Sequence, residues 1–406
     1  MDNELIATFA CGKNAARDTF AMVLCNIMII ERTSYLAKLA YGLEHFPIVS
    51  LLGPRQSGKT SLARAFAAKR EHVHYFDLED PRDWNLLSTN LTLLETLQGL
   101  VILDEVQRLP MLFPFLRVLA DREKPSAQFL LLGSASGALA QNASESLAGR
   151  VFLIPVEGFS LNEIDDSQKL WMRGGFPKSF LAEDTQLSNV WRDAFIKTFL
   201  EKDLLAFGEK VSLQNVWRFW HMVSHYHGNL LNTSEIGQSM GVDHKTVKNY
   251  LDILCDTFMI TALKPWFSNV KKRMVKSPKI YIRDSGILHS LLGVDDYNQL
   301  IKHPKLGASW EGFALHQILH VFQPRDSYFW RTATGSEIDL LFEHKGKLCG
   351  FEFKLNGDPS LTKSMMTALA DIPLDSLTIV TPNSKTLALS EKATLVSLAD
   401  VCARGM

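Results

Sequence analysis

The strongest constraint on this chain is the octapeptide at residues 53–60, which reads Gly-Pro-Arg-Gln-Ser-Gly-Lys-Thr. It follows the apolar run 48–52 and precedes a segment with helical spacing, so a strand, a glycine loop and a helix succeed one another. The glycines let successive backbone N–H groups turn toward one anion, and the positive end of the helix dipole favours the same anion. We therefore expect a Walker A phosphate loop rather than a chance glycine loop ahead of a helix.

The loop predicts a nucleotide and a metal ion as cofactors, ATP and Mg²⁺. Lys59 is expected to reach the β- and γ-phosphates, and the Thr60 hydroxyl is expected to bind the magnesium. The residues expected to contact the nucleotide are Gly53, Pro54, Arg55, Gln56, Ser57, Gly58, Lys59, Thr60 and Ser61.

The apolar run 100–103 ends in Asp104 and Glu105, the pattern of a Walker B strand. Asp104 at the strand end is placed to hold the magnesium, and Glu105 to orient or polarise the attacking water. An ordinary strand that ends in acidic residues is the alternative, which the full glycine loop upstream makes less attractive.

A further buried strand is expected at residues 129–134. Its last residue, Ser134, is either a sensor of the γ-phosphate or a simple turn residue. Arg150 follows a Leu-Ala-Gly sequence. It either supplies positive charge to the transition state, in this subunit or in a neighbour, or is a solvated surface arginine.

Composition restricts the other functions. At 406 residues the chain is long enough for two or three domains. A charged fraction of 21% and a net charge of -1 indicate neither disorder nor a globally basic nucleic-acid binder, so any DNA contact must come from local patches. The five cysteines are scattered and form no C-x-x-C pair, which favours a reduced, cytoplasmic chain without structural zinc.

Residues 1–30 form an atypical N-terminal extension. The run 20–30 is apolar and follows basic residues, as in a signal peptide. No small-x-small cleavage site comes after it, which disfavours a signal peptide. The run is also much shorter than the roughly 20 residues of a membrane span, so we expect no membrane association. A core helix remains possible, as does a native start at Met22 or Met28.

The middle of the chain predicts a helix-turn-helix at residues 231–251, with two capped helices and a glycine turn between them. His244, Lys245 and Lys248 lie near the start of the second helix, where a recognition helix meets DNA. Residues 258–266 are expected to form a wing. The basic stretch after it comprises Lys271, Lys272, Arg273, Lys276 and Lys279. DNA binding and a purely structural role in packing or dimerisation both fit this pattern.

Two segments of alternating polarity within residues 337–354 are joined by a glycine turn and predict a β-hairpin. With the turn centred on residues 345–346, Asp339 lies opposite Glu352, about 5 Å away, and Lys354 shares their face. Facing carboxylates repel unless a cation lies between them, which predicts Mg²⁺ or Mn²⁺ there, with Lys354 activating water or steadying a phosphate.

This hairpin resembles the PD-(D/E)xK nuclease core. In that family a glutamate on the preceding helix often completes the site, and Glu311 matches by position. The resemblance implies Asp339, Glu352 and Lys354 as catalytic residues and Glu311, Asp339 and Glu352 as metal ligands. Ile338 stands where the family usually has proline. The alternatives are a degenerate core kept as a binding scaffold and an ordinary hairpin with a salt bridge.

Several motifs together carry a wider resemblance, from about Ile29 almost to the C-terminus. They are the glycine loop, Leu-Asp-Glu-Val-Gln-Arg-Leu-Pro from residue 103, Gly-Ser-Ala-Ser from 133, Leu-Ala-Gly-Arg from 147 and Gly-Gly-Phe-Pro from 174. With these motifs the chain is similar to prokaryotic AAA-superfamily ATPases, related to archaeal-type ATPases, that carry a C-terminal domain of uncharacterised function. The resemblance implies an ATP-binding core, a winged-helix middle and a nuclease-like end.

The expected fold class is α/β, with a parallel-sheet P-loop NTPase domain, a helical winged-helix-type domain and an α/β restriction-endonuclease-like domain. The expected boundaries are 1–30 for the extension, 31–157 for the ATPase, 158–190 for a linker, 191–285 for the winged helix and 286–406 for the nuclease-like domain.

The expected function is that of an intracellular, Mg-dependent ATPase coupled to a DNA-associated winged-helix and nuclease-like module. Its expected partners are ATP, DNA and further copies of the chain in a homo-oligomer. A non-catalytic nucleotide switch and a protein-interaction scaffold are the alternatives.

Overall fold

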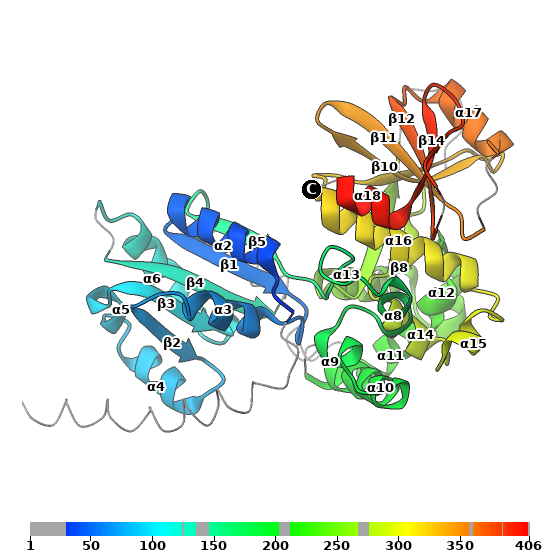
Figure 1. Cartoon of the computed structure of the whole chain (residues 1–406). Coiled ribbons are helices and arrows are strands. Elements are labelled where there is room, and N and C mark those ends of the chain that lie inside the picture. Colours follow the sequence, from blue (N-terminus) through cyan, green and yellow to red (C-terminus); the bar gives the residue numbers. More distant parts are fainter. Residues whose placement is uncertain are drawn as a thin grey trace, which may run out of the picture.

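The computed structural model describes residues 30–123, 126–134, 146–202, 212–266, 276–356, 360–383 and 385–404. The expected N-terminal extension up to residue 29, residues 271–273 of the basic stretch and the side chain of Ser134 lie outside this description. In Figure 1 a five-stranded sheet with its helices lies on the left, and the rest of the chain lies on the right.

The N-terminal sheet has the order β2-β3-β4-β1-β5, and all of its neighbouring strands are parallel. Its strands are β1 (Ile48–Gly53), β2 (Val73–Asp77), β3 (Gly99–Asp104), β4 (Ala127–Ser134) and β5 (Val151–Pro155). The accompanying helices are α2 (Thr33–His45), α3 (Lys59–Ala67), α4 (Pro81–Thr89), α5 (Leu93–Thr96) and α6 (Leu112–Ala120), with a 3-10 turn η2 (Val106–Arg108).

Apolar side chains cover both faces of this sheet, as a parallel sheet requires. Along β1, Val49 and Leu51 pack with α2 and α3, whereas Ile48 and Leu52 pack with α6. The octapeptide connects β1 to α3 at the carboxyl edge, beside the ends of β3 and β4. That edge is where open α/β sheets bind ligands.

A second, nine-stranded sheet organises the remaining described residues, in the order β13-β14-β12-β11-β10-β9-β7-β8-β6. Its strands are β6 (Asn229–Leu230), β7 (Ile260–Pro265), β8 (Lys279–Ile282), β9 (Tyr328–Arg331), β10 (Glu337–His344), β11 (Lys347–Phe353), β12 (Ser376–Thr381), β13 (Leu387–Ala388) and β14 (Ala393–Ser397). The expected boundary between residues 285 and 286 separates strands of this one sheet, because β7 pairs with both β8 and β9.

The helices around this sheet are α8 (Ser167–Arg173), α9 (Pro177–Phe180), α10 (Thr185–Lys202), α11 (Leu213–His225), α12 (Thr233–Met240), α13 (His244–Asp256), α14 (Ser285–Leu291), α15 (Tyr297–Leu300), α16 (Leu306–Phe322), α17 (Lys363–Asp371) and α18 (Leu398–Arg404). Along the part of the chain that the structure describes, none of the helices combines the length and the apolar character needed to cross a membrane.

The helix pair α12 and α13 has the caps that the sequence predicts. Asn232 accepts a hydrogen bond from the backbone N–H of Glu235, and Asp243 accepts one from that of Thr246. Gly241, at φ +70°, ends α12 in the left-handed conformation that glycine adopts without strain.

Residues 158–190, which we expected to be a linker, are folded into a core. They contain α8 and α9, and they bury Phe159, Trp171 and Phe180 in one cluster with side chains of α16 and β10. The Gly-Gly-Phe-Pro sequence reflects close packing, because a side chain on Gly175 would lie 2.5 Å from the backbone oxygen of Phe159. Turn-forming residues therefore gave a misleading impression of flexibility.

The β10–β11 hairpin has the register that its turn predicts. Leu340 pairs with Phe351 and His344 pairs with Lys347. One further step of this antiparallel ladder brings Asp339 opposite Glu352.

A buried polar chain connects α8, α14 and α16. The Trp171 indole donates to Ser309 Oγ at 2.9 Å, and His289 Nδ1 contacts the Met172 carbonyl at 3.0 Å. Since a carbonyl only accepts, Nδ1 carries the proton, and His289 Nε2 accepts from the Ser309 hydroxyl at 2.7 Å. This arrangement requires a neutral imidazole, and burial accordingly lowers the pKa of His289 to about 4.

We expect the protein to lose stability as the pH falls from about 6.5 to about 4. In that window the unfolded chain binds a proton at residue 289 that the folded chain does not bind, so each unit of pH costs up to about 1.4 kcal/mol per such histidine. Burial lowers the pKa of His316 to about 4 as well. Thermal unfolding at several pH values should show a weaker pH dependence for His289→Gln than for wild type. The exposed His244→Gln control should retain the wild-type dependence, and equal slopes in all three proteins would contradict this interpretation.

Candidate functional site

The glycine loop closes tightly against the end of β5. A side chain on Gly53 would lie 2.0 Å from the Val156 carbonyl oxygen, so only glycine fits there. Gly58 precedes α3 with φ +94°, again in the left-handed region. The backbone thus turns sharply before the nine-residue helix α3, whose N-terminal N–H groups attract an anion.

Lys59 lies inside the curve of this loop and is buried. Its ammonium donates to the carbonyl oxygens of Gly53 at 3.0 Å and Pro54 at 2.8 Å. The positive charge is therefore held beside the backbone groups that would surround a phosphate.

Asp104 at the end of β3 accepts hydrogen bonds from two hydroxyl groups on the same carboxylate oxygen. Thr60 Oγ1 lies 2.8 Å from it and the Tyr75 hydroxyl 2.6 Å. Burial and the adjacent carboxylate raise the pKa of Tyr75, so its hydroxyl stays a donor. Thr60 and Asp104 supply the hard oxygen donors that Mg²⁺ prefers, so these residues fit that metal.

Glu105 directly follows Asp104 in an unusual backbone conformation, with φ 55°. Its carboxylate accepts a hydrogen bond from the Gln107 side chain. Burial is the main factor that raises its pKa, and the charge of Arg55 opposes this shift. A poorly solvated carboxylate at this position can act as a proton acceptor or orient a water molecule.

The pocket in front of the loop is lined from two parts of the chain. From the N-terminal sheet come loop residues, among them Arg55, Lys59 and Thr60, together with Glu79 and Glu105. Residues of α9 and α10 form the opposite wall, and the sequence analysis did not identify them. They are Pro177, Lys178, Phe195, Thr198 and Phe199.

Two further predicted residues lie at opposite ends of the parallel strands. Ser134 is paired with Gly53, so its backbone ends beside the start of the loop. Arg150 precedes Val151, which is paired with Ile48 at the far end of β1, about 17 Å away along the strand. There Arg150 forms an ion pair with Asp121. Within one chain, Arg150 does not belong to the phosphate loop's surroundings.

Arg32, which the sequence analysis did not identify, connects the loop to the segment after β5. Its guanidinium donates to the Ser57 carbonyl at 3.2 Å and to the Glu157 and Gly158 carbonyls at 3.0 and 2.9 Å. It also forms a buried ion pair with Glu163. The loop backbone is therefore tied directly to the chain that leaves the ATPase sheet.

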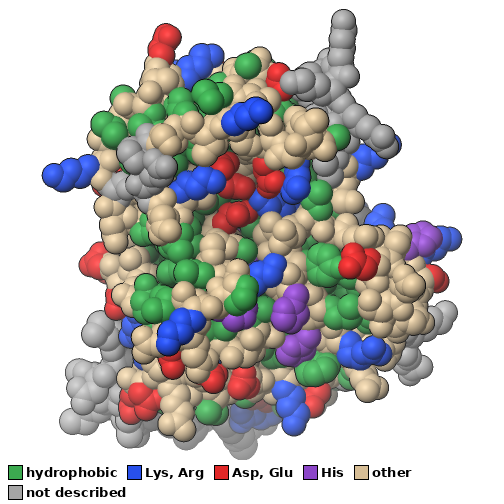
Figure 2. Space-filling view, turned by 90° about the vertical axis from the view of Figure 1, so that its right-hand side faces the viewer, with side chains coloured by type: hydrophobic (Ala, Val, Ile, Leu, Met, Phe, Trp, Pro, Cys, Tyr) green, Lys and Arg blue, Asp and Glu red, His purple; other side chains and the backbone are tan. Residues whose placement is uncertain are grey.

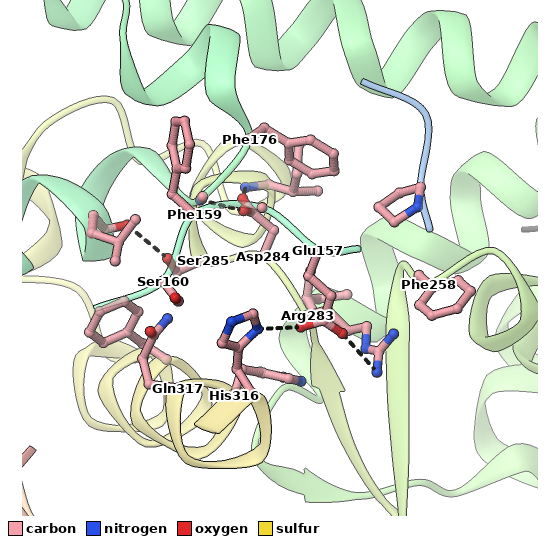
Figure 3. A pocket seen from close by; sticks show the side chains of 18 of the residues that line it. Glu157, Phe159, Ser160, Phe176, Phe258, Arg283, Asp284, Ser285, His316 and Gln317 are labelled. Carbon is pink, nitrogen blue, oxygen red and sulfur yellow. Dashed lines mark hydrogen bonds and ion pairs between the residues drawn. The ribbon is translucent and has the colours of Figure 1, made fainter. Parts of the chain in front are cut away.

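Glu157 continues this connection to the second sheet. Its carboxylate lies 3.3 Å from Arg283, which follows β8, and 3.6 Å from His320 of α16. Burial alone would raise the pKa of Glu157, but these basic neighbours outweigh burial and lower it. Figure 3 shows Glu157 and Arg283 at a cavity that Phe176, Asp284 and Gln317 also line.

The predicted nuclease-like side chains converge, but around an ammonium group. Lys279 Nζ lies 2.7 Å from Glu311, 2.5 Å from Glu337 and 2.9 Å from Asp339. Glu352 is adjacent and pairs with Lys354 at 2.8 Å. The sequence places Lys279 in the basic stretch after the wing, where charged residues are usually solvated, whereas its side chain is only 3% exposed. Sequence neighbours could not reveal that β8 turns this lysine inward.

The buried charges in this cluster perturb one another. Burial acts to lower the pKa of Lys279, but the neighbouring carboxylates outweigh it and hold the pKa well above its usual value. Burial and the charge of Asp339 raise the pKa of Glu311 to about 7 and that of Glu352 to about 8.

The expected metal ligands Glu311, Asp339 and Glu352 do not form a vacant ligand set. Among the residues that the structure describes, no group of three or more His, Cys, Asp and Glu side chains is arranged to hold a metal ion. The ammonium of Lys279 lies among the carboxylates of Glu311, Glu337 and Asp339. This arrangement does not fit a divalent cation.

Comparison with known families divides the chain into three matched regions. Residues 45–165 match an AAA domain, residues 164–298 match a domain of unknown function, DUF8612, and residues 306–401 match another, DUF4143. Among solved structures, a Walker-type ATPase of Pyrococcus abyssi is similar, with a TM-score of 0.48 and 18% identity. The match covers 65% of this chain and 96% of that one.

Two curated relatives match most of the chain. The uncharacterized protein Rv2008c of Mycobacterium tuberculosis and the uncharacterized protein Mb2031c of Mycobacterium bovis are each 44% identical to it over 380 residues. These cover 93% of this chain and 86% of each relative. The phosphate loop, the parallel sheet and the AAA-domain match together identify a P-loop AAA-like ATPase domain. The chain thus belongs to the family of these two mycobacterial proteins, with an AAA domain ahead of a DUF4143 domain.

Proposed function

We propose that the chain binds ATP with Mg²⁺ at the loop 53–60 and hydrolyses it slowly. The observation that supports this most is the convergence of three side chains on one pocket, with a fourth directly behind them. Lys59, Thr60 and Glu105 line it, and Asp104 accepts a hydrogen bond from Thr60. A phosphate site, a metal site and a carboxylate for water therefore adjoin one another.

Each of these side chains has a separate role in the proposed reaction. Lys59 neutralises the β- and γ-phosphates, and Thr60 and Asp104 hold the metal ion. When bound, Mg²⁺ supplies further positive charge to the transferred phosphoryl group. Glu105 accepts a hydrogen bond from the attacking water and orients it while the bond to phosphorus forms.

The main rival is a nucleotide switch without turnover. Glu105 favours hydrolysis, because a switch needs only the loop and its metal ligands. The half-buried, hydrogen-bonded position of Glu105 within the pocket supports a chemical role.

We also propose that nucleotide binding influences the rest of the chain. Arg32 contacts the loop backbone at Ser57, and Glu157 joins the same region to Arg283 beside β8. Lys178 and Thr198 line the nucleotide pocket from α9 and α10. A bound triphosphate would therefore contact both structural units.

The helices α11 to α13 with strands β6 to β8 are proposed to act as a DNA-associated winged helix. His244, Lys245 and Lys248 are exposed at the start of α13, as a recognition helix requires. Packing or dimerisation remains the alternative use of this unit.

The nuclease-like assignment of the C-terminal domain is supported by the convergence of Asp339, Glu352 and Lys354 with Glu311. Lys279 opposes metal-dependent cleavage, because it lies where these carboxylates would share a metal ion. We therefore propose a nuclease-like scaffold, and not cleavage, for the wild-type chain.

Arg150 can serve a nucleotide only in a neighbouring copy, so its predicted role depends on a homo-oligomer.

A cytoplasmic location, where ATP is available, also stays a prediction.

Lys59→Ala should weaken ATP binding about 10- to 100-fold, because a charge-assisted contact of about 1.5–3 kcal/mol is lost. Isothermal titration calorimetry with a non-hydrolysable ATP analogue measures this directly. Lys69→Ala is the matched control, since Lys69 is exposed and pairs with Glu31 at the surface. Equal affinity in the two variants would rule out Lys59 as a phosphate ligand.

Glu105→Gln should bind ATP as wild type does and lose turnover by about 10²- to 10⁴-fold. Because burial raises the pKa of Glu105, wild-type kcat should fall on acidification at a higher pH than an ordinary glutamate would give. The carboxylate is the active form, so activity is present above this pKa and lost below it. Phosphate release measured across pH tests both the loss of turnover and the pH dependence. Undiminished turnover in the glutamine variant would remove Glu105 from the mechanism.

Lys245→Ala and Lys248→Ala should each weaken binding of duplex DNA and reduce its dependence on salt by about one unit of log–log slope. Fluorescence anisotropy at several salt concentrations measures both effects, and phosphate release with and without DNA tests the coupling. Lys69→Ala again serves as the control. If both variants match it, α13 does not contact DNA.

A further inference from the structure

The acidic cleft of the C-terminal domain is built around a lysine from another part of the sheet. Lys279 lies on β8, whereas Glu311 lies on α16 and Asp339 on β10. Figure 2 shows a face of the molecule on which acidic and basic side chains lie together in a hollow. Glu311 and Glu337 keep 17% and 21% of their side chains exposed, so a solvent ion can reach them.

Strand β8 presents two groups to this cleft. Lys279 and Tyr281 are two residues apart, so they lie on the same face of the strand. The Tyr281 hydroxyl donates to Glu311 at 2.5 Å, and Lys279 contacts the same carboxylate oxygen. The strand thus holds Glu311 by two donors and fixes the position of the ammonium.

The position of this ammonium is that of a shared cation. Lys279 Nζ is within 3 Å of oxygens from three carboxylates, and a metal ion bound by all three would occupy the same space. Like charges this close require a compensating cation, since each buried charge is costly without a partner.

The cleft contains more carboxyl groups than basic groups even with this lysine. Glu311, Glu337, Asp339 and Glu352 are acidic, and the basic groups that contact them are Lys279, Lys354 and Arg331. One oxygen of Glu352, Oε2, is buried and has no hydrogen-bond partner among the described residues. The carboxylate set would therefore accept a divalent ion if Lys279 were absent.

We propose that Lys279 is the resident cation of this cleft and excludes a divalent metal ion from it. The position that a shared metal ion would take is occupied by a side chain of the same polypeptide. The wild-type cleft therefore needs no metal to be stable. Removing the ammonium leaves at least three carboxylates that can bind Mn²⁺ or Mg²⁺ through oxygen.

The proposal is tested by Mn²⁺ binding to the full-length, nucleotide-free protein, measured by electron paramagnetic resonance of free Mn²⁺. Lys279→Ala should bind one Mn²⁺ per chain that neither wild type nor Lys279→Ala/Asp339→Asn binds. Lys279→Arg keeps a cation in place, and Lys276→Ala removes an exposed lysine nearby. Both should behave like wild type. An Mn²⁺ site in wild type that Asp339→Asn abolishes would overturn the proposal.

Thermal unfolding gives a second, independent measurement. Lys279→Ala should be less stable than wild type without metal, because its carboxylates lack their cation, and Mn²⁺ should raise its midpoint by several degrees. Mn²⁺ should leave the midpoints of wild type and Lys279→Arg unchanged. A Lys279→Ala protein that Mn²⁺ does not stabilise, or that remains unfolded in Mn²⁺, would also overturn the proposal.

Discussion

The guanidinium of Arg32 is the interaction on which the arrangement of this chain most depends. It contacts the phosphate loop at the Ser57 carbonyl, and it also contacts the carbonyls of Glu157 and Gly158 and the carboxylate of Glu163. One buried side chain therefore joins the loop to the segment that leads into the second sheet. Because it satisfies several carbonyls and a carboxylate at once, its loss would leave buried polar groups without partners.

The two acidic sites of the chain are compensated in different ways. Asp104 is held by neutral hydroxyl groups from Thr60 and Tyr75, which orient the carboxylate and leave its negative charge in place. Asp339, in contrast, contacts the ammonium of Lys279, which cancels charge. The first arrangement suits the metal ion that we propose at Asp104, and the second agrees with the proposed exclusion of one at Asp339. Similar acidic motifs thus differ in chemistry because of their nearest donors.

Local patterns predicted the parts of the structure that local forces determine. The octapeptide, the apolar strand before Asp104, the caps at Asn232 and Asp243 and the register of the β10–β11 hairpin all depend on residues close in sequence. Contacts between distant segments were not predictable in this way. Arg32, Glu157 and the α9–α10 wall of the nucleotide pocket acquire their roles only through tertiary packing. Lys279 was misinterpreted because its charged sequence neighbours suggested a solvated surface.

The continuity of the nine-stranded sheet has a consequence for how this family can evolve. The boundary between the two matched domains of unknown function, near residues 298–306, lies between β8 and β9, yet both strands flank β7 in one sheet. A genetic break at that boundary would separate β7 and β8 from β9. Each product would then expose an unpaired strand edge and an apolar face. The two regions are therefore expected to be inherited as a pair, even though they are distinct in sequence.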